Sequence, residues 1–214
     1  MNFYAIKRTK DHIKYWKNRK ADWKKSYLDT ADHPHRKLIT GILCDLKGWN
    51  AIFEIGCNAA PNMVALLKRR PRTMVGACDV NEEAIKLANE TMIGGNFMAG
   101  SADDVFMSDK SVDIVLSDMT LIYVSPRDIN RYIKELKRVG RQYVLLCEFH
   151  SESWWNRKAL KFNTGYYAHD YKRLLEKHGF YDICYYKLKE EDWPGGNPQK
   201  TFAYLILAKI PYRN

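Results

Sequence analysis

Short apolar runs alternate with amphipathic segments along most of this chain. The apolar runs are rich in Val, Ile and Cys, which suits buried β-strands. The amphipathic segments repeat apolar residues every three or four positions, as helices packed on a core do. The predicted strands are residues 50–55, 73–78, 96–99, 112–116, 142–147, 181–188 and 201–209. The predicted helices are residues 11–28, 34–46, 63–70, 81–93, 125–139 and 170–178.

The order of these elements indicates the fold class. Strand–helix alternation produces right-handed βαβ units and a parallel sheet with helices on both faces. The last two strands, 181–188 and 201–209, are joined by a long turn rich in Gly and Pro, which predicts an antiparallel hairpin. We therefore expect a doubly wound α/β fold with a mostly parallel seven-stranded sheet and a C-terminal antiparallel hairpin.

The helical pattern at 11–28 precedes the alternating region. Trp16 and Tyr27 fall with other apolar residues on one face of it, and lysines and arginines fill the remainder. This aromatic face either packs permanently over the domain or belongs to a lid that closes over a ligand, with the basic side recruiting an anionic substrate. We expect residues 1–36 to form an N-terminal helical lid or extension and residues 37–214 to form the main domain.

Length and charge narrow the functional classes. The chain has 214 residues, enough for one α/β domain with a substantial core. It has no apolar run near the roughly 20 residues of a membrane span, and its N-terminus lacks the apolar core of a signal peptide. We therefore expect a cytoplasmic protein with no membrane partner. The net charge of +10 predicts attraction to anions, whether nucleic acid, an anionic metabolite or an acidic protein.

The cysteines and histidines indicate neither disulfides nor a metal site. The five cysteines are odd in number and form no CxxC pair, so we expect reduced thiols. His33 and His35 are the only tightly spaced histidine pair, and no Cys or carboxylate cluster joins them in sequence. We therefore expect that no metal is bound.

The segment AIFEIGCNAAPN, residues 51–62, is the most informative stretch for function. Its apolar residues predict a buried strand, and the small residues that follow predict a tight turn into a helix near Pro61. Gly56 has no Cβ and can take a positive φ, so a ligand can approach the backbone of this turn closely. Glu54 is an acid inside the apolar run, and a buried acid is costly unless it has a partner. We therefore expect a ligand at this turn.

Polar residues recur where the predicted parallel strands end, the edge at which open α/β sheets bind ligands. They are Glu54, Gly56, Asp79, Ser101, Asp103, Asp118, Glu148 and His150. Asp79 follows Gly56 by 23 residues, and an acid at the end of the second strand can accept two hydrogen bonds from a ribose diol. The sequence thus predicts a nucleoside-containing cofactor. A turn with one glycine is poor for the pyrophosphate of a dinucleotide.

Taken in order, these motifs resemble those of class I S-adenosylmethionine-dependent methyltransferases. The similar segments are EIGCN at 54–58, ACDVN at 77–81, GSAD at 100–103 and SDMTLIYV at 117–124, which match the first to fourth motifs of that family. The resemblance covers about residues 38–210 and includes the terminal hairpin. It implies a Rossmann-like fold, methyl transfer as the activity, S-adenosyl-L-methionine as the cofactor and S-adenosyl-L-homocysteine as its product.

The resemblance also implies roles for single residues. Glu54 organises a loop that cradles the methionine end of the cofactor, Asp79 holds the ribose hydroxyls, and Val80 packs on the adenine. The third motif contacts the adenine amino group, and the fourth lies beneath the transferable methyl. The cofactor-binding residues implied in this way are Glu54, Gly56, Cys57, Asn58, Asp79, Val80, Ser101, Ala102, Asp103, Asp118, Met119 and Tyr123.

The chain departs from the family pattern in two motifs. Asn58 and Ala60 replace small glycines of the first motif, and Asn tolerates left-handed backbone better than most residues. Ser101 replaces a common acid of the third motif, so the adenine amine is left to Asp103 or to the backbone. These changes concern the affinity for the cofactor more than the fold.

The implied chemistry asks little of the protein. An in-line displacement depends chiefly on holding nucleophile, carbon and sulfur aligned. Such alignment can lower the activation free energy by about 7–11 kcal/mol. A general base is needed only when the acceptor binds in its protonated form. Asp118 is the best-placed acid by topology and His150 the best-placed imidazole, so both are candidate catalytic residues.

The methyl acceptor is less constrained. The fourth motif lacks the Asp/Asn-Pro-Pro-aromatic run associated with methylation of exocyclic base amines, so nucleic acid is an open alternative but not the favoured one. The loop expected at 150–167 is rich in aromatic and basic residues and forms either a substrate wall or ordinary packing. We expect a small-molecule acceptor, anionic or sugar-like. Methylation of RNA, DNA or protein and a non-catalytic partner subunit are the alternatives.

Overall fold

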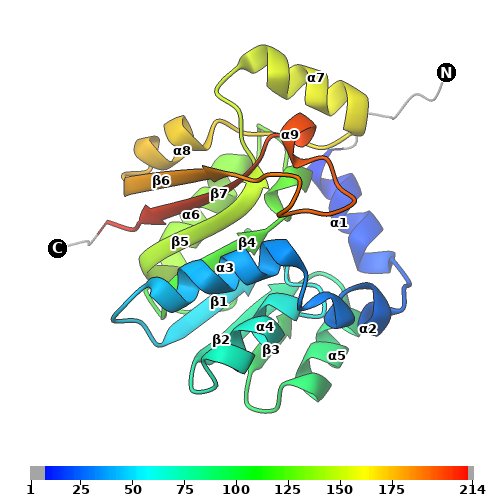
Figure 1. Cartoon of the computed structure of the whole chain (residues 1–214), viewed down its shortest axis with the longest axis vertical. Coiled ribbons are helices and arrows are strands. Elements are labelled where there is room, and N and C mark those ends of the chain that lie inside the picture. Colours follow the sequence, from blue (N-terminus) through cyan, green and yellow to red (C-terminus); the bar gives the residue numbers. More distant parts are fainter. Residues whose placement is uncertain (1–7, 212–214) are drawn as a thin grey trace.

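The computed structural model describes residues 8–211, which form one seven-stranded sheet with helices on both faces (Figure 1). The strands are β1 (Ala51–Ile55), β2 (Met74–Asp79), β3 (Asn96–Ala99), β4 (Val112–Asp118), β5 (Gly140–Phe149), β6 (Tyr181–Lys187) and β7 (Ala203–Lys209). Their order across the sheet is β3-β2-β1-β4-β5-β7-β6. Strands β1 to β5 are parallel, and β7 is antiparallel to both of its neighbours. The predicted doubly wound fold with a C-terminal antiparallel hairpin is confirmed.

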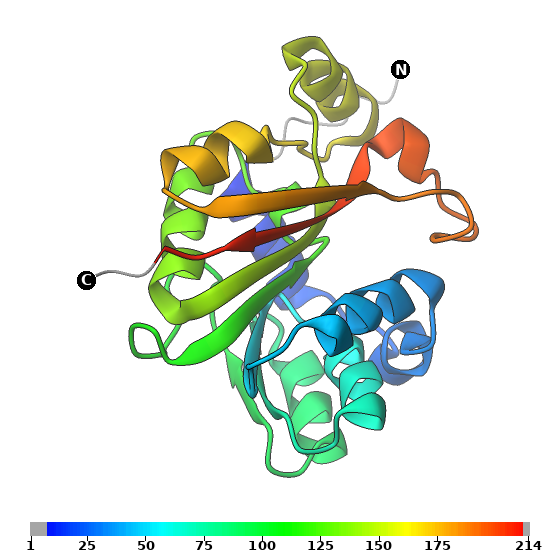
Figure 2. The ribbon, with the colours of Figure 1, turned by 60° about the vertical axis from the view of Figure 1, so that its left-hand side comes forward.

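Alternate residues of the central strands pack into two cores, one on each face of the sheet. Ile52 lies in the core shared with α3, α4 and α5, whereas Phe53 and Ile55 lie in the core shared with α6 and α8. These helices are α3 (Pro34–Asp45), α4 (Pro61–Arg69), α5 (Glu82–Thr91), α6 (Ile129–Val139) and α8 (Tyr171–Lys177). Figure 2 shows the two groups on opposite sides of the sheet. Burial of both faces explains why β1 is continuously apolar rather than alternating.

The topological switch point lies between β1 and β4. From β1 the chain proceeds outward through β2 to β3, and it then returns to β4 on the other side of β1. The connections that leave the carboxyl ends of β1 and β4 therefore diverge and leave a crevice between them, which is where open α/β sheets bind ligands.

The predicted helix 11–28 is wrong as a single element. The chain instead forms α1 (Thr9–Asn18), α2 (Trp23–Ser26) and a 3-10 turn (Leu28–Thr30). Helix α1 ends because Arg19 is extended, and the Asn81 side chain donates hydrogen bonds to the carbonyl oxygens of Trp16 and Arg19 at 2.8 and 2.9 Å. These tertiary bonds satisfy carbonyls that a further helical turn would have used. Residues 1–7 of the expected extension lie outside the described part of the chain.

The helix expected at 125–139 begins later than predicted. Helix α6 starts at Ile129, because the Ser125 hydroxyl donates to the Asp128 carboxylate at 2.7 Å and the residues between them form a turn. The Ser-Pro-Arg-Asp sequence therefore precedes the helix and does not form its first turn.

The loop expected at 150–167 contains a helix, α7 (Trp154–Thr164). The Ser153 side chain accepts a hydrogen bond at its start, and Gly165 ends it with a φ of 78°. The predicted strand at 201–209 is also shortened, because a short helix, α9 (Pro198–Thr201), precedes β7. None of the helices in residues 8–211 has the length and apolar character needed to cross a membrane.

Replacing Gly56 by Ala should destabilise the fold in two separable ways. Gly56 has a φ of +66°, which costs an L-residue about 1–2 kcal/mol, and an added Cβ would overlap the Thr120 side chain. Gly94 is a matched control, because its φ is +90° and no atom lies within 4 Å of its Cβ position. In denaturant unfolding we expect G56A to lower the free energy of unfolding by about 1–3 kcal/mol more than G94A does. The double variant G56A/T120A should recover part of that difference. Equal costs for G56A and G94A would contradict this account of the turn.

Candidate active site

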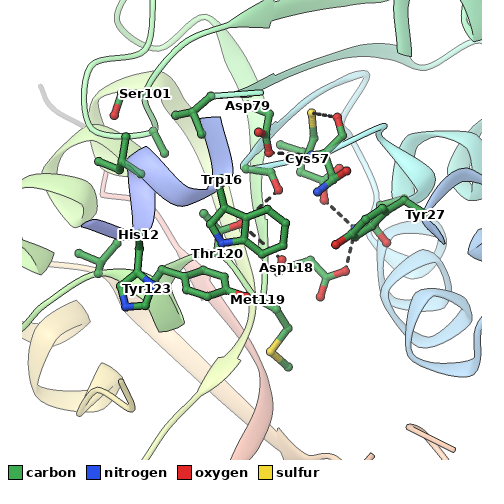
Figure 3. A pocket seen from close by; sticks show the side chains of 18 of the residues that line it. His12, Trp16, Tyr27, Cys57, Asp79, Ser101, Asp118, Met119, Thr120 and Tyr123 are labelled. Carbon is green, nitrogen blue, oxygen red and sulfur yellow. Dashed lines mark hydrogen bonds between the residues drawn. The ribbon is translucent and has the colours of Figure 1, made fainter. Parts of the chain in front are cut away.

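A cavity at the carboxyl edge of the sheet gathers most of the predicted residues (Figure 3). The predicted residues that line it are Glu54, Gly56, Cys57, Asn58, Asp79, Val80, Ser101, Ala102, Asp118, Met119 and Tyr123. Asp103 does not line it, since this carboxylate pairs with Arg131 and accepts a hydrogen bond from the Ser101 hydroxyl. Further lining residues, which the motifs did not assign to the site, include Thr9, His12, Trp16, Tyr27, His35, Arg36, Asn62, Thr120, Tyr132 and Trp193.

The loop between β1 and α4 forms the floor of the cavity and turns through left-handed backbone. Gly56, Asn58 and Ala60 have φ values of 66°, 58° and 55°. The Asn58 N–H donates to the Asp79 carboxylate at 2.9 Å, and the Cys57 N–H donates to the carbonyl of Cys78 at 3.0 Å. The loop therefore keeps its turn without the glycines of the family motif, because it is bonded to the end of β2.

Asp79 is held in place by backbone donors on both sides. One carboxylate oxygen accepts the Asn58 N–H, and the other accepts the Asn81 N–H at 2.8 Å. Burial raises the pKa of Asp79 above its ordinary value, although these backbone bonds oppose the shift. Each oxygen keeps a lone pair for a further donor.

Two carboxylates meet at the centre of the cavity and share one amide. The Asn62 side chain donates to Glu54 Oε1 at 2.6 Å and to Asp118 Oδ2 at 3.0 Å. Glu54 Oε2 and Asp118 Oδ1 are buried and have no hydrogen-bond partner within residues 8–211. Burial raises the pKa of Glu54 to about 8. This shift favours the protonated form of Glu54 at neutral pH, and its second oxygen is available to a ligand.

Asp118 has the opposite electrostatic environment. Burial disfavours its charged form, but His35 Nε2 at 3.1 Å and the Arg36 guanidinium at 2.8 Å outweigh that effect and hold the pKa of Asp118 well below its usual range. Trp193 stacks on the His35 ring with centroids 4.0 Å apart. The His33 ring nitrogen lies 2.6 Å from that of His35, and burial, together with the neighbouring His35 and Arg36, lowers the pKa of His33 to about 4.

Glu148, at the end of β5, positions the loop that follows β4. Its carboxylate accepts hydrogen bonds from the Ser117 hydroxyl and from the backbone N–H groups of Thr120, Leu121 and Ile122, at 2.6 to 3.1 Å. The 3-10 turn Leu121–Tyr123 therefore begins on a buried acid, whose pKa burial raises to about 7. Glu148 does not line the cavity, and it acts on the site through this loop.

Helix α1 covers the cavity and is attached to its rim at both ends. At the first end the Thr9 hydroxyl bonds to Asp128 and accepts the Ser125 N–H at 2.9 Å. At the other end the Asn81 amide donates to the Trp16 and Arg19 carbonyls. Between them the Trp16 ring packs edge-on against Tyr123, with centroids 5.4 Å apart.

His150 lies outside the cavity, in packing behind β5. The Tyr171 N–H donates to His150 Nδ1 at 3.2 Å, and the His150 ring stacks on Tyr185 with centroids 5.2 Å apart. Burial lowers the pKa of His150. The structure thus brings Asp118 into the cavity and leaves His150 out of it. Within residues 8–211 no group of three or more His, Cys, Asp or Glu side chains is arranged to hold a metal ion.

Comparisons with known proteins agree with this architecture. Residues 52–142 match the family model described as a methyltransferase domain. No curated protein matches the chain in sequence. Geranyl diphosphate C-methyltransferase from Streptomyces coelicolor A3(2), solved with Mg²⁺, geranyl diphosphate and S-adenosyl-L-homocysteine, is 13% identical and superposes with a TM-score of 0.71 over 99% of this chain and 100% of that chain.

Two further solved structures share the fold. Magnesium protoporphyrin IX methyltransferase from Synechocystis PCC 6803 is 13% identical, with a TM-score of 0.64 over 98% of this chain and 100% of that chain. A structure from Haloferax volcanii, a complex of a methyltransferase activator with a methyltransferase, gives 14% identity and a TM-score of 0.63 over 86% of this chain and 92% of that chain. At these identities the likeness concerns the fold alone. Residues 52–142 therefore match a methyltransferase domain, and the described chain shares its fold with solved methyltransferases.

Proposed function

We propose that this methyltransferase acts on a small-molecule acceptor that binds in the same cavity as the cofactor. The observation that supports this most is that α1 lines one side of the cavity and is attached to the rim at both ends. The space beside Asp118 and Met119 is bounded by His12, Trp16 and Trp193. A small acceptor fits in the space beside α1, and the attached helix narrows the access that RNA, DNA or a protein would need.

The residues that line the cavity fit S-adenosylmethionine along the carboxyl ends of β1, β2 and β4. Asp79 has lone pairs for the two ribose hydroxyls, and Val80, Ser101 and Ala102 surround the adenine end. Glu54 Oε2, a buried oxygen without a partner in the described chain, suits the ammonium of the methionine end. When bound, the cofactor supplies a methyl group on a positively charged sulfur. Met119, Thr120 and Tyr123 then bound the space next to that methyl group.

Asp118 has an electrostatic role in this proposal. A carboxylate whose pKa lies well below the usual range is a weak proton acceptor at neutral pH. It remains ionised, and its negative charge lies in a cavity that receives a cationic cofactor. Since the departing thioether is neutral, this anion also favours binding of the substrate over the product. We assign no proton transfer to His150, which lies outside the cavity.

The net charge of +10 favours one alternative, an acidic macromolecule as the acceptor. The names of two solved neighbours instead specify small molecules, geranyl diphosphate and magnesium protoporphyrin IX. A labelling experiment separates these classes.

The protein should transfer a labelled methyl group to small molecules. We expect one molecule of S-adenosylmethionine to bind per chain in calorimetry. After incubation with methyl-labelled cofactor and a fractionated cell extract, we expect label in the metabolite fraction, identified by mass spectrometry. Label confined to RNA, DNA or protein would contradict the proposed acceptor class and leave the cofactor site intact. Failure to bind the cofactor would contradict the placement of the cofactor itself.

Cofactor binding should release a proton from Glu54. At pH 6.5 the free carboxyl is protonated, because its pKa is raised to about 8, and the ammonium of the cofactor favours the ionised form. The affinity should therefore rise as the pH rises toward 8. Calorimetry at pH 6.5 in buffers of different ionisation enthalpy should show release of nearly one proton more for the wild type than for E54Q. Equal proton release by the two proteins would rule out Glu54 as the group that ionises.

Loosening the attachment of α1 should weaken cofactor binding. Asn81→Ser keeps an oxygen to cap α5 but removes the amide that donates to the Trp16 and Arg19 carbonyls. Losing two hydrogen bonds of about 1 kcal/mol each should lower the affinity for S-adenosylmethionine by up to about thirtyfold and speed its release.

Asn89→Ser is the matched control for this variant. The Asn89 amide also donates to two carbonyl oxygens, those of Ile85 and Phe97, but it lies away from the cavity. We expect both variants to lose similar thermal stability and only N81S to lose affinity, measured by stopped-flow fluorescence and calorimetry. An equal loss of affinity in both would show that α1 is ordinary packing and not a roof.

A further inference from the structure

Helix α7 presents an apolar face to solvent rather than to the core. Leu160 is its one buried residue. Trp155 and Phe162 are 75% and 85% exposed, and Ala159 between them is also exposed. These three residues are spaced i, i+4 and i+7, so they lie on one side of the helix. Trp154, 51% exposed, packs edge-on against Trp155 and extends this face.

The same helix is basic. Residues 154–164 contain Arg157, Lys158 and Lys161 and no acid. The Lys158 ammonium lies over the Trp154 ring, 5.2 Å from its centroid, at the border of the apolar face. The Arg157 guanidinium donates to the carbonyl oxygens of Ser151 and Glu152, so its charge is not neutralised by an acid of this helix. An apolar face bordered by the Lys158 ammonium is complementary to a lipid surface, which is apolar inside and anionic at its headgroups.

Helix α7 lies at the cavity end of the molecule and is connected to the cavity wall. It follows the carboxyl end of β5 and projects from the body of the protein in both ribbon views (Figures 1 and 2). Directly after it, the Tyr166 ring packs on Tyr123, which lines the cavity, with centroids 5.5 Å apart. The Tyr167 N–H donates to the carbonyl of Ile122 at 2.8 Å. A surface bound by α7 is therefore close to the site.

We propose that the outer face of α7, formed by Trp154, Trp155, Ala159 and Phe162, docks on an anionic lipid bilayer. The indole rings lie at the level of the headgroups, Phe162 enters the acyl boundary, and Lys158 meets the lipid phosphates. The expectation that the protein has no membrane partner rested on the missing apolar span. An interfacial helix needs no span, and it binds by apolar area together with attraction to anionic lipid.

A bilayer suits this face better than a protein groove or nucleic acid. The apolar side chains project from a convex helix, and a fluid interface can surround such a helix without a complementary pocket. The net charge of +10 adds long-range attraction to an anionic surface. Because the whole helix is only about 16 Å long at 1.5 Å per residue, the binding is weak and reversible.

Vesicle co-sedimentation tests the proposal on the whole chain. We expect the wild type to bind vesicles of phosphatidylcholine mixed with phosphatidylglycerol at low salt, and added salt should release it. It should bind vesicles of pure phosphatidylcholine only weakly. W155S/F162S should lose at least about tenfold in binding to the anionic vesicles, and Lys158→Glu should lose part of it. Phe106→Ser is the matched control, because Phe106 is 91% exposed between β3 and β4, and it should bind as the wild type does.

Two further measurements separate loss of membrane docking from loss of fold. Cofactor binding by calorimetry and the far-ultraviolet circular dichroism of W155S/F162S should match the wild type, which separates loss of docking from loss of fold. Tryptophan emission should shift to shorter wavelength on addition of anionic vesicles, and W154F/W155F should lose this shift. The proposal is overturned if the wild type does not bind anionic vesicles or if W155S/F162S binds them as well as F106S. A wild-type dimer that W155S/F162S converts to a monomer, without vesicle binding, would assign the face to a second copy of the chain instead.

Discussion

The shared amide of Asn62 is the interaction on which the site depends. It holds the carboxylates of Glu54 and Asp118 beside each other in a buried place, where two negative charges would repel strongly. The conflict is resolved by their different surroundings: Arg36 and His35 keep Asp118 ionised, while burial keeps Glu54 protonated. Around the Asn62 amide, the free cavity thus holds an ionised Asp118 beside a neutral Glu54. A ligand with two positive centres, a sulfonium and an ammonium, suits such a site, because its second positive charge favours ionisation of Glu54.

The roof and the floor of the cavity are attached to the same short turn after β2. The Asn81 N–H holds the Asp79 carboxylate, its side-chain oxygen caps α5, and its side-chain amide holds the end of α1. Any movement of this turn therefore affects the Asp79 carboxylate and the helix that covers it together. The N-terminal segment is thus part of the site, although it precedes the strand–helix alternation that defines the domain.

The sequence predicted what depends on local pattern, and it missed what depends on distant partners. The strands, the hairpin and the edge where the polar residues meet follow from periodicity and from the direction of parallel strands. No local signal marks the functional roles of Asn62, His35 and Arg36. Their roles arise only when α3 and α4 place them against the end of β4. Arg36, for example, bonds to Asp118, which lies 82 residues further along the chain. The break after α1 also escapes a local pattern, because the bonds that replace its next turn come from Asn81.

Helix α7 was missed for a different reason. Its signals are local, a Ser cap and a left-handed Gly, but an aromatic and basic segment whose apolar face points to solvent lacks the pattern of a helix that packs on a core. The position of His150 was misleading in the same way, since a polar residue at a strand end can face the packing behind the strand as readily as the cavity in front of it.

The first motif shows how a departure from a family pattern can add chemistry. Asn58 and Ala60 sit in left-handed backbone, which costs an Ala about 1–2 kcal/mol and an Asn less. A hydrogen bond to a charged group contributes about 1.5–3 kcal/mol, so the bond from the Asn58 N–H to Asp79 is large enough to offset the strain. Glycine at position 58 would relieve the strain and leave bare backbone. Asn58 instead places a buried amide oxygen, unpartnered in residues 8–211, on the wall of the cavity. The substitution therefore keeps the turn and adds a polar group that a bound cofactor can satisfy.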